Sequence, residues 1–134
     1  MTGSPLTVVM YHYVRPISRS RYPGIKGLEL ELFREQLGYI ARHYTAVTME
    51  AVVAAIRGEE SLPSNAALLT FDDGYRDHHD FVLPLLVEKG LQGSFFVPAK
   101  PVVSKCVLDV NKVHFILASA SDAGLVAAEM ELMM

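Results

Sequence analysis

Two adjacent aspartates, Asp72 and Asp73, follow an apolar run at residues 66–71 and stand directly before Gly74. Neighbouring side chains of a strand point to opposite faces, so the two carboxylates can converge on one site only if the chain turns there. Gly74 permits such a turn, because glycine tolerates backbone angles that other residues resist. Two carboxylates this close do not both stay ionised without a compensating cation. The stretch predicts a divalent-metal site with one free carboxylate as general base, or alternatively a pair of solvated turn residues.

Short apolar runs predict the strands that position this pair. These runs lie at residues 6–12, 45–47, 66–71 and 93–98. Apolar residues at helical spacing predict helices at residues 30–43, 48–57 and 77–89. Strands that alternate with helices predict an α/β fold with a mostly parallel sheet, whose strands are buried on both faces. Ligands of such folds gather at the carboxyl ends of the strands, which is where Asp72 lies.

Caps and breakers give further expectations about the helices. Thr48 is placed as an N-cap, and Asn111 and Asp122 are placed as caps of helices in the C-terminal part of the chain. Residues 99–105 have the composition of a loop. Pro84 falls inside the helix predicted at 77–89, so it must lie in the first helical turn or kink the helix.

Composition bounds the function. The chain has 134 residues, 51% hydrophobic and 20% charged, which is typical of one globular domain. A net charge of -3 does not favour binding to nucleic acid or to an anionic membrane. No apolar run is long enough for a membrane span. One cysteine, Cys106, excludes an internal disulfide. The N-terminus lacks a basic stretch before its short apolar run, so the sequence predicts no signal peptide and a cytoplasmic protein.

The segment "LLTFDDGYRDHHDFVLPLLVEKGLQGSFFVPA" resembles the first signature of the polysaccharide deacetylase family, the NodB-homology group or carbohydrate esterase family four. The stretches "VVMYHYV" and "FREQLGYIARHYTAVTMEAVVAAI" are similar to the N-terminal half of the same domain. The resemblance covers residues 6–99, and "KCVLDVNKVHFILA" resembles an insertion of some members. It implies that residues 1–134 are a partial deacetylase domain, with 100–134 as a helical insertion or a truncated continuation.

The resemblance also implies chemistry. The fold would be the N-terminal portion of a distorted, incomplete (β/α) barrel. The activity would be metal-dependent hydrolysis of N-acetyl groups on an amino-sugar polymer or oligosaccharide. Asp72 matches the family's catalytic base, and Asp73 matches the aspartate that ligates a divalent metal, commonly zinc. The two histidine ligands of the family come from a His-x-x-x-His type of motif, which this sequence does not contain.

Other polar residues near the pair are weaker candidates. His12 ends the first predicted strand, beside the expected place of Asp72, so it contacts substrate, supports the site or simply packs. Tyr75 and Arg76 follow the pair and can line the cleft. His78 and His79 point about 100° apart on a helix and cannot both face one metal, so solvated positions are expected.

Two further functions remain open at this stage. Receiver domains of phosphate signalling also hold magnesium with paired acids at a strand end, although there the pair follows the first strand. A sugar-binding or interaction module without catalysis would keep the cleft but not the chemistry. Few predicted strands leave a barrel unclosed, so we expect residues 1–134 to belong to a longer deacetylase. We also expect self-association through the uncovered apolar surface.

Overall fold

The computed structural model describes residues 5–133 of the chain. Its strands are β1 (Leu6–Tyr11), β2 (Val14–Arg15), β3 (Leu28–Glu29), β4 (Thr45–Ala46), β5 (Ala66–Asp72) and β6 (Ser94–Phe96). Its α-helices are α1 (Leu30–His43), α2 (Met49–Ile56), α3 (Leu83–Glu88), α4 (Ala99–Ser104), α5 (Asp109–Ser119) and α6 (Ala123–Leu132). A 3₁₀ turn, η1 (Ile17–Arg19), and a π-helical turn, η2 (His78–Val82), complete the elements.

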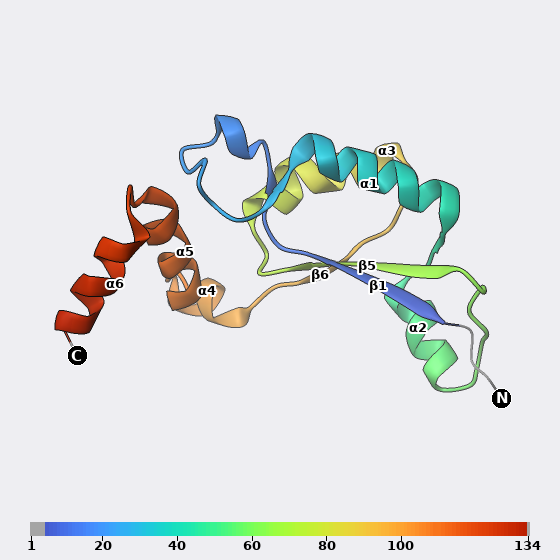
Figure 1. Ribbon diagram of the computed structural model, residues 1–134. Helices are drawn as coiled ribbons and strands as arrows, with labels where there is room; N and C mark the ends of the chain where they lie inside the picture. The colour runs from blue at the N-terminus through green and yellow to red at the C-terminus, as the bar shows by residue number, and fades with distance from the viewer. Residues whose placement is uncertain (1–4, 134) are drawn as a thin grey trace.

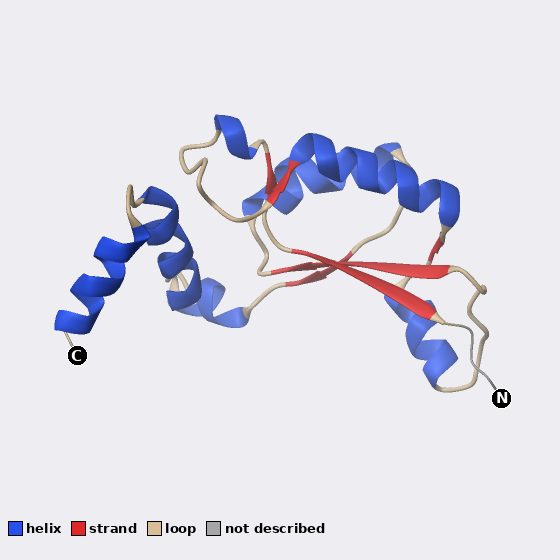
Figure 2. Cartoon of the chain, viewed as in Figure 1, coloured by secondary structure: helices blue, strands red, loops and turns tan. Residues whose placement is uncertain are grey.

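The main sheet is parallel and is centred on β5 (Figure 2). β1 pairs with β5 along its length, from Leu6 opposite Ala66 to Tyr11 opposite Phe71. β4 and β6 share the other edge of β5, because β4 pairs with its first residues and β6 with its last. Helices α1 and α3 lie on one face of the sheet and α2 on the other (Figure 1). The expected α/β fold with a parallel sheet is confirmed.

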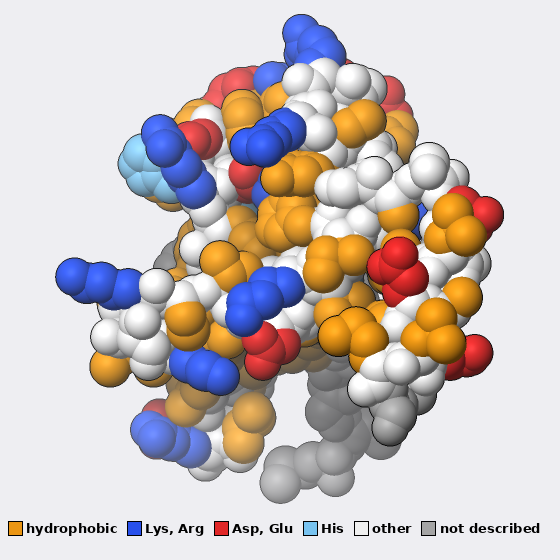
Figure 3. All heavy atoms as spheres, turned by 90° about the vertical axis from the view of Figure 1, so that its left-hand side faces the viewer, with side chains coloured by type: hydrophobic (Ala, Val, Ile, Leu, Met, Phe, Trp, Pro, Cys, Tyr) orange, Lys and Arg blue, Asp and Glu red, His pale blue; other side chains and the backbone are white. Residues whose placement is uncertain are grey.

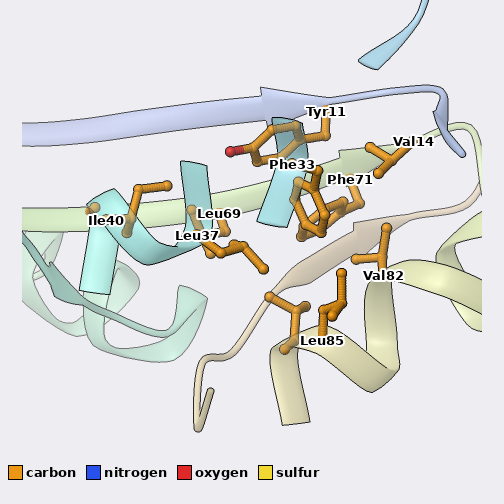
Figure 4. Packing of buried hydrophobic residues seen from close by; sticks show 11 residues of the cluster. Tyr11, Val14, Phe33, Leu37, Ile40, Leu69, Phe71, Val82 and Leu85 are labelled. Atoms are coloured by element: carbon orange, nitrogen blue, oxygen red, sulfur yellow. The ribbon is translucent and has the colours of Figure 1, made fainter. Parts of the chain in front are cut away.

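Alternation along β5 divides the core between the two faces. Leu69 and Phe71 pack with Phe33 and Leu37 of α1 (Figure 4), whereas Leu68 faces the α2 side. β5 is buried on both faces because helices cover both, which is why its sequence is continuously apolar. This burial fixes the strand that ends at the aspartate pair.

Two predicted caps are confirmed. The Thr48 hydroxyl accepts a hydrogen bond from the Ala51 amide at 3.1 Å, and Asp122 Oδ1 accepts one from the Gly124 amide at 2.8 Å. The cap at Asn111 is wrong, because α5 begins at Asp109 and Asn111 lies buried inside its first turn. The loop expected at 99–105 is also wrong, because residues 99–104 form α4.

The segment with Pro84 is helical in two parts. It opens with the π-helical turn η2, and Pro84 is the second residue of α3. Proline lacks an amide hydrogen and tolerates the first turn of a helix, so the irregular turn before it accommodates the ring. One consequence is that His78 turns inward, as described below.

The end of the molecule that carries α4, α5 and α6 exposes many apolar side chains. Figure 3 views this end, where hydrophobic side chains lie between charged ones. Val103 is 79% exposed and Leu132 is 87% exposed, and on the sheet Met10 of β1 is 60% exposed. Self-association through such surface stays a prediction. Within residues 5–133, no helix is both long and apolar enough to cross a membrane.

Candidate active site

The chain turns sharply at the carboxyl end of β5. Asp72 is the last residue of the strand, and Asp73 and Gly74 both take left-handed backbone angles, with φ of 73° and 61°. A Cβ atom on Gly74 would lie 2.7 Å from Val97 Cγ1, so both the backbone angle and the close approach require glycine. The turn brings both carboxylates to one cavity.

This cavity has a volume of about 590 Å³. It is open to solvent and is lined by Thr70, Asp72, Asp73, Phe96, Val97 and Pro98. The acidic groups come from the end of β5 and the turn after it, and the apolar wall comes from β6 and the residues after it. A polar edge that faces an apolar wall suits a sugar ring, which has hydroxyl groups around an apolar face.

The two carboxylates have different surroundings. Asp73 Oδ2 accepts a hydrogen bond of 2.6 Å from the Tyr75 hydroxyl. Among the side chains of residues 5–133, none forms a hydrogen bond or ion pair with the Asp72 carboxylate, which is half-buried at the cavity. Asp73 is therefore tethered through Tyr75, whereas the Asp72 carboxylate has no such tether among the described side chains.

Tyr75 belongs to a buried polar cluster behind the cavity. Its ring stacks on Tyr13 with centroids 4.2 Å apart, and its hydroxyl accepts a hydrogen bond of 2.7 Å from Asn111 Nδ2. Burial, followed by the hydrogen bond to Asp73, raises the pKa of Tyr75 well above its ordinary value. The phenol therefore stays protonated near neutral pH and remains a donor to Asp73.

His12 lies beside the aspartate pair. It directly follows β1, whose Tyr11 is level with Phe71, so His12 stands next to Asp72 at the same edge of the sheet. Its side chain is exposed. The His12 backbone carbonyl accepts a hydrogen bond of 2.8 Å from His78 Nε2, which ties the end of β1 to the turn η2.

The prediction of a solvated His78 is wrong. The residue is 4% exposed, because the π-helical turn directs its ring against Phe71, with centroids 5.6 Å apart. Its Nε2 must carry the hydrogen, since a carbonyl only accepts, and its Nδ1 is buried without a partner among the described residues. His79 is exposed as predicted, with an 83% exposed side chain beside Asp80.

Arg76 points away from the cavity. Its side chain is 89% exposed and contacts Asp80 at 2.9 Å, as an exposed pair four residues apart on the helical segment. Asp77, which directly follows Arg76, forms its ion pair with Arg15 of β2. Of the three weaker candidates, the structure thus brings His12 and Tyr75 to the aspartate pair but not Arg76.

The family resemblance implies a divalent metal at the aspartate pair, which would need further ligands nearby. No group of three or more His, Cys, Asp or Glu side chains within residues 5–133 is placed to hold a metal ion. A zinc site takes three or four protein ligands. Among the described residues that line the cavity, the charged groups are the carboxylates of Asp72 and Asp73. The described residues therefore do not make up a complete zinc site.

Sequence reasoning missed Asn111. It is 7% exposed, and its amide reaches both Tyr13 and Tyr75, which are far away along the chain. A signal was available, because Asn111, Phe115 and Ala118 are spaced four and three residues apart and so share one face of a helix. A polar residue on an otherwise apolar helix face indicates a buried partner.

Comparison with known protein families matches residues 59–126 to the family described as polysaccharide deacetylase. Among curated proteins, a poly-beta-1,6-N-acetyl-D-glucosamine N-deacetylase of Escherichia coli is 39% identical over 54 residues. That match covers 40% of this chain and 8% of the curated protein.

Solved structures show the same fold. IcaB from Ammonifex degensii is 30% identical with a TM-score of 0.59, and the match covers 71% of this chain and 39% of IcaB. The deacetylase PplD of Streptococcus pyogenes, solved with acetate, is 20% identical with a TM-score of 0.60, covering 81% of this chain and 50% of PplD. The chain thus spans half or less of each of these relatives.

Proposed function

Since the chain belongs to the polysaccharide deacetylase family, we propose that it supplies the catalytic carboxylate for hydrolysis of N-acetyl groups on an amino-sugar polymer or oligosaccharide. One observation carries the proposal. Asp72, without a side-chain partner among the described residues, and the tethered Asp73 line one cavity at the carboxyl end of β5, inside the segment that matches the family.

The reaction needs a base, a held carbonyl and a proton for the leaving amine. In the proposed mechanism Asp72 takes a proton from a water molecule while the oxygen of that water adds to the acetamide carbonyl carbon. The carbon–nitrogen bond then breaks, and the proton that Asp72 took from water passes to the departing nitrogen, so that acetate and the free sugar amine are released. Phe96, Val97 and Pro98 form the apolar wall for the sugar ring. His12, exposed beside Asp72, is the group we assign to contact the sugar.

The fold supports a wider proposal. We propose that the open parallel sheet is the N-terminal portion of a distorted (β/α) barrel. Three parallel pairings converge on β5, and the outer edge of β1 has no partner strand within residues 5–133. The matched solved structures are about twice as long as the part that this chain covers, or longer.

The family resemblance implies a divalent ion, and Asp73 is the residue we assign as one of its ligands. Because the described residues offer no complete donor set, further ligands must come from elsewhere. No chemical step above is therefore assigned to the metal.

The separate roles of the two aspartates can be tested by metal binding. The test protein is a chimera in which this chain replaces the part of Ammonifex degensii IcaB that it matches, here called the IcaB chimera. Asp73→Asn should weaken zinc binding in isothermal calorimetry, because it removes a charged ligand, whereas Asp72→Asn should leave binding largely intact. The 134-residue chain alone should bind zinc weakly. Equal loss of zinc in both variants would contradict the assignment.

A non-catalytic sugar-binding module is the second candidate. The lack of a three-ligand metal group within residues 5–133 favours it. It predicts sugar binding without acetate release in both the chain and the IcaB chimera. No observation supports the receiver-domain alternative. The segment that contains Asp72 and Asp73 matches the polysaccharide deacetylase family.

A further inference from the structure

We propose that Asn111 of α5 is a positioning residue of this site: it fixes the Tyr75 hydroxyl so that the phenolic hydrogen points at Asp73. This deepens the proposed function, because it assigns a role in the site to the helical segment that follows the catalytic turn. The geometric part of the inference does not depend on catalysis and can be tested without substrate or metal.

The hydrogen-bond directions follow from what each group can do. In the 2.6 Å contact the Tyr75 hydroxyl donates to Asp73 Oδ2, which accepts. A hydroxyl has one hydrogen, so Tyr75 can only accept in its 2.7 Å contact with Asn111. Asn111 must therefore present its amino group, as observed, and the phenolic hydrogen has one direction left to point.

The second amide hydrogen of Asn111 has its own partner. Nδ2 also lies 3.1 Å from the Tyr13 hydroxyl, and the Tyr13 ring stacks on the Tyr75 ring. One side chain thus spans two stacked tyrosines and uses both of its amino hydrogens. Since Asn111 is 7% exposed, water does not compete freely for these bonds.

Asp73 needs such a tether. Its φ of 73° lies in the left-handed region, which residues other than glycine seldom adopt. Among the side chains of residues 5–133, Tyr75 is the hydrogen-bond partner of its carboxylate. The relay Asn111–Tyr75–Asp73 therefore sets where this carboxylate stands in the cavity.

Packing holds α5 where the relay requires it. Phe115 lies against Tyr22, with ring centroids 4.8 Å apart, and also contacts Tyr13 edge-on. The backbone approaches closely at Gly24, where a Cβ atom would lie 2.9 Å from the Ala118 carbonyl oxygen. These contacts are apolar or steric and do not touch the Asn111 amide, so packing and relay can be separated by mutation.

The experiment measures backbone order at Asp73 and Gly74 by ¹⁵N relaxation of the 134-residue chain. Order parameters should be about 0.85 in the unchanged protein, as for rigid backbone, and should fall toward about 0.6 in Asn111→Leu. Tyr75→Phe should give a similar fall. The double variant should be no more mobile than either single variant, because Asn111 acts through Tyr75.

Two further variants keep the test decisive. Phe115→Leu reduces the packing of α5 but keeps the Asn111 amide, so it should lower the order at Asp73 and Gly74 much less than Asn111→Leu does. Asn111→Asp removes both amino hydrogens but keeps the shape of the side chain, so it should mobilise Asp73 even if Asn111→Leu fails to fold. Unchanged order in the Asn111 variants, additive effects with Tyr75→Phe, or equal mobility in Phe115→Leu would each overturn the inference. A failure of the proposed function would appear separately, as a lack of acetate release with the relay intact.

Discussion

Asp72→Asn should lower the rate of acetate release by the IcaB chimera about 10²- to 10⁴-fold, which is the usual contribution of a general base. Asparagine keeps the size and shape of the side chain but cannot take a proton from water. The Asp72 carboxylate has no side-chain partner among the described residues, so the substitution breaks no observed ion pair or hydrogen bond of that group. The loss should therefore be in turnover and not in folding.

The matched control is Asp80→Asn. Asp80 lies only eight positions further along, its carboxylate faces Arg76 and His79, and it is not among the residues that line the cavity. We expect acetate release close to that of the unchanged chimera. Circular dichroism should show equal helix content in both variants. Turnover retained in Asp72→Asn, or lost equally in both variants, would remove Asp72 from the role of base.

Phe71→Ala should reduce the free energy of unfolding by about 3–5 kcal/mol, a large part of the 5–15 kcal/mol of a typical domain. The Phe71 ring is fully buried and stacks on Tyr11 and Phe95, with centroids 5.1 and 4.9 Å away. Its removal leaves a cavity between β1, β6 and α1, directly behind Asp72. Urea unfolding of the chain, followed by circular dichroism, measures the loss.

The control for this substitution is Phe96→Ala. It removes the same atoms from the neighbouring strand, but Phe96 is 48% exposed, so less apolar contact is lost. The midpoint in urea should fall much less than for Phe71→Ala. Equal shifts for the two variants would mean that the sheet face under α1 and α3 is not the main core.

The four strands of the main sheet and the turn after β5 could be predicted because their signals are local, whereas the two-residue strands β2 and β3 were not predicted. An apolar run of strand length, two aspartates and a glycine determine β5 and the turn after it, and the structure has both where the sequence places them. The roles of Asp72 as base and Asp73 as ligand stay predictions. The parallel sheet followed from the alternation of strands and helices.

The surroundings of His78 and Asn111 were predicted wrongly because they depend on long-range contacts. His78 looks like a solvated helix residue until the π-helical turn before Pro84 rotates it onto Phe71. Asn111 resembles a cap because asparagine favours helix starts, but its partners are tyrosines that precede it by 36 and 98 positions. Periodicity within one segment contains no information about such partners.

The most direct test of the central claim is acetate release by the IcaB chimera from an N-acetylglucosamine oligosaccharide in H₂¹⁸O, with unaltered IcaB measured beside it. If this chain supplies the catalytic carboxylate of a deacetylase, each free amine formed should be matched by one acetate carrying one ¹⁸O atom from water. The Asp72→Asn chimera should form both products about 10²- to 10⁴-fold more slowly. A folded chimera that binds the oligosaccharide but releases no acetate, under conditions where IcaB does, would contradict the account and favour the non-catalytic module.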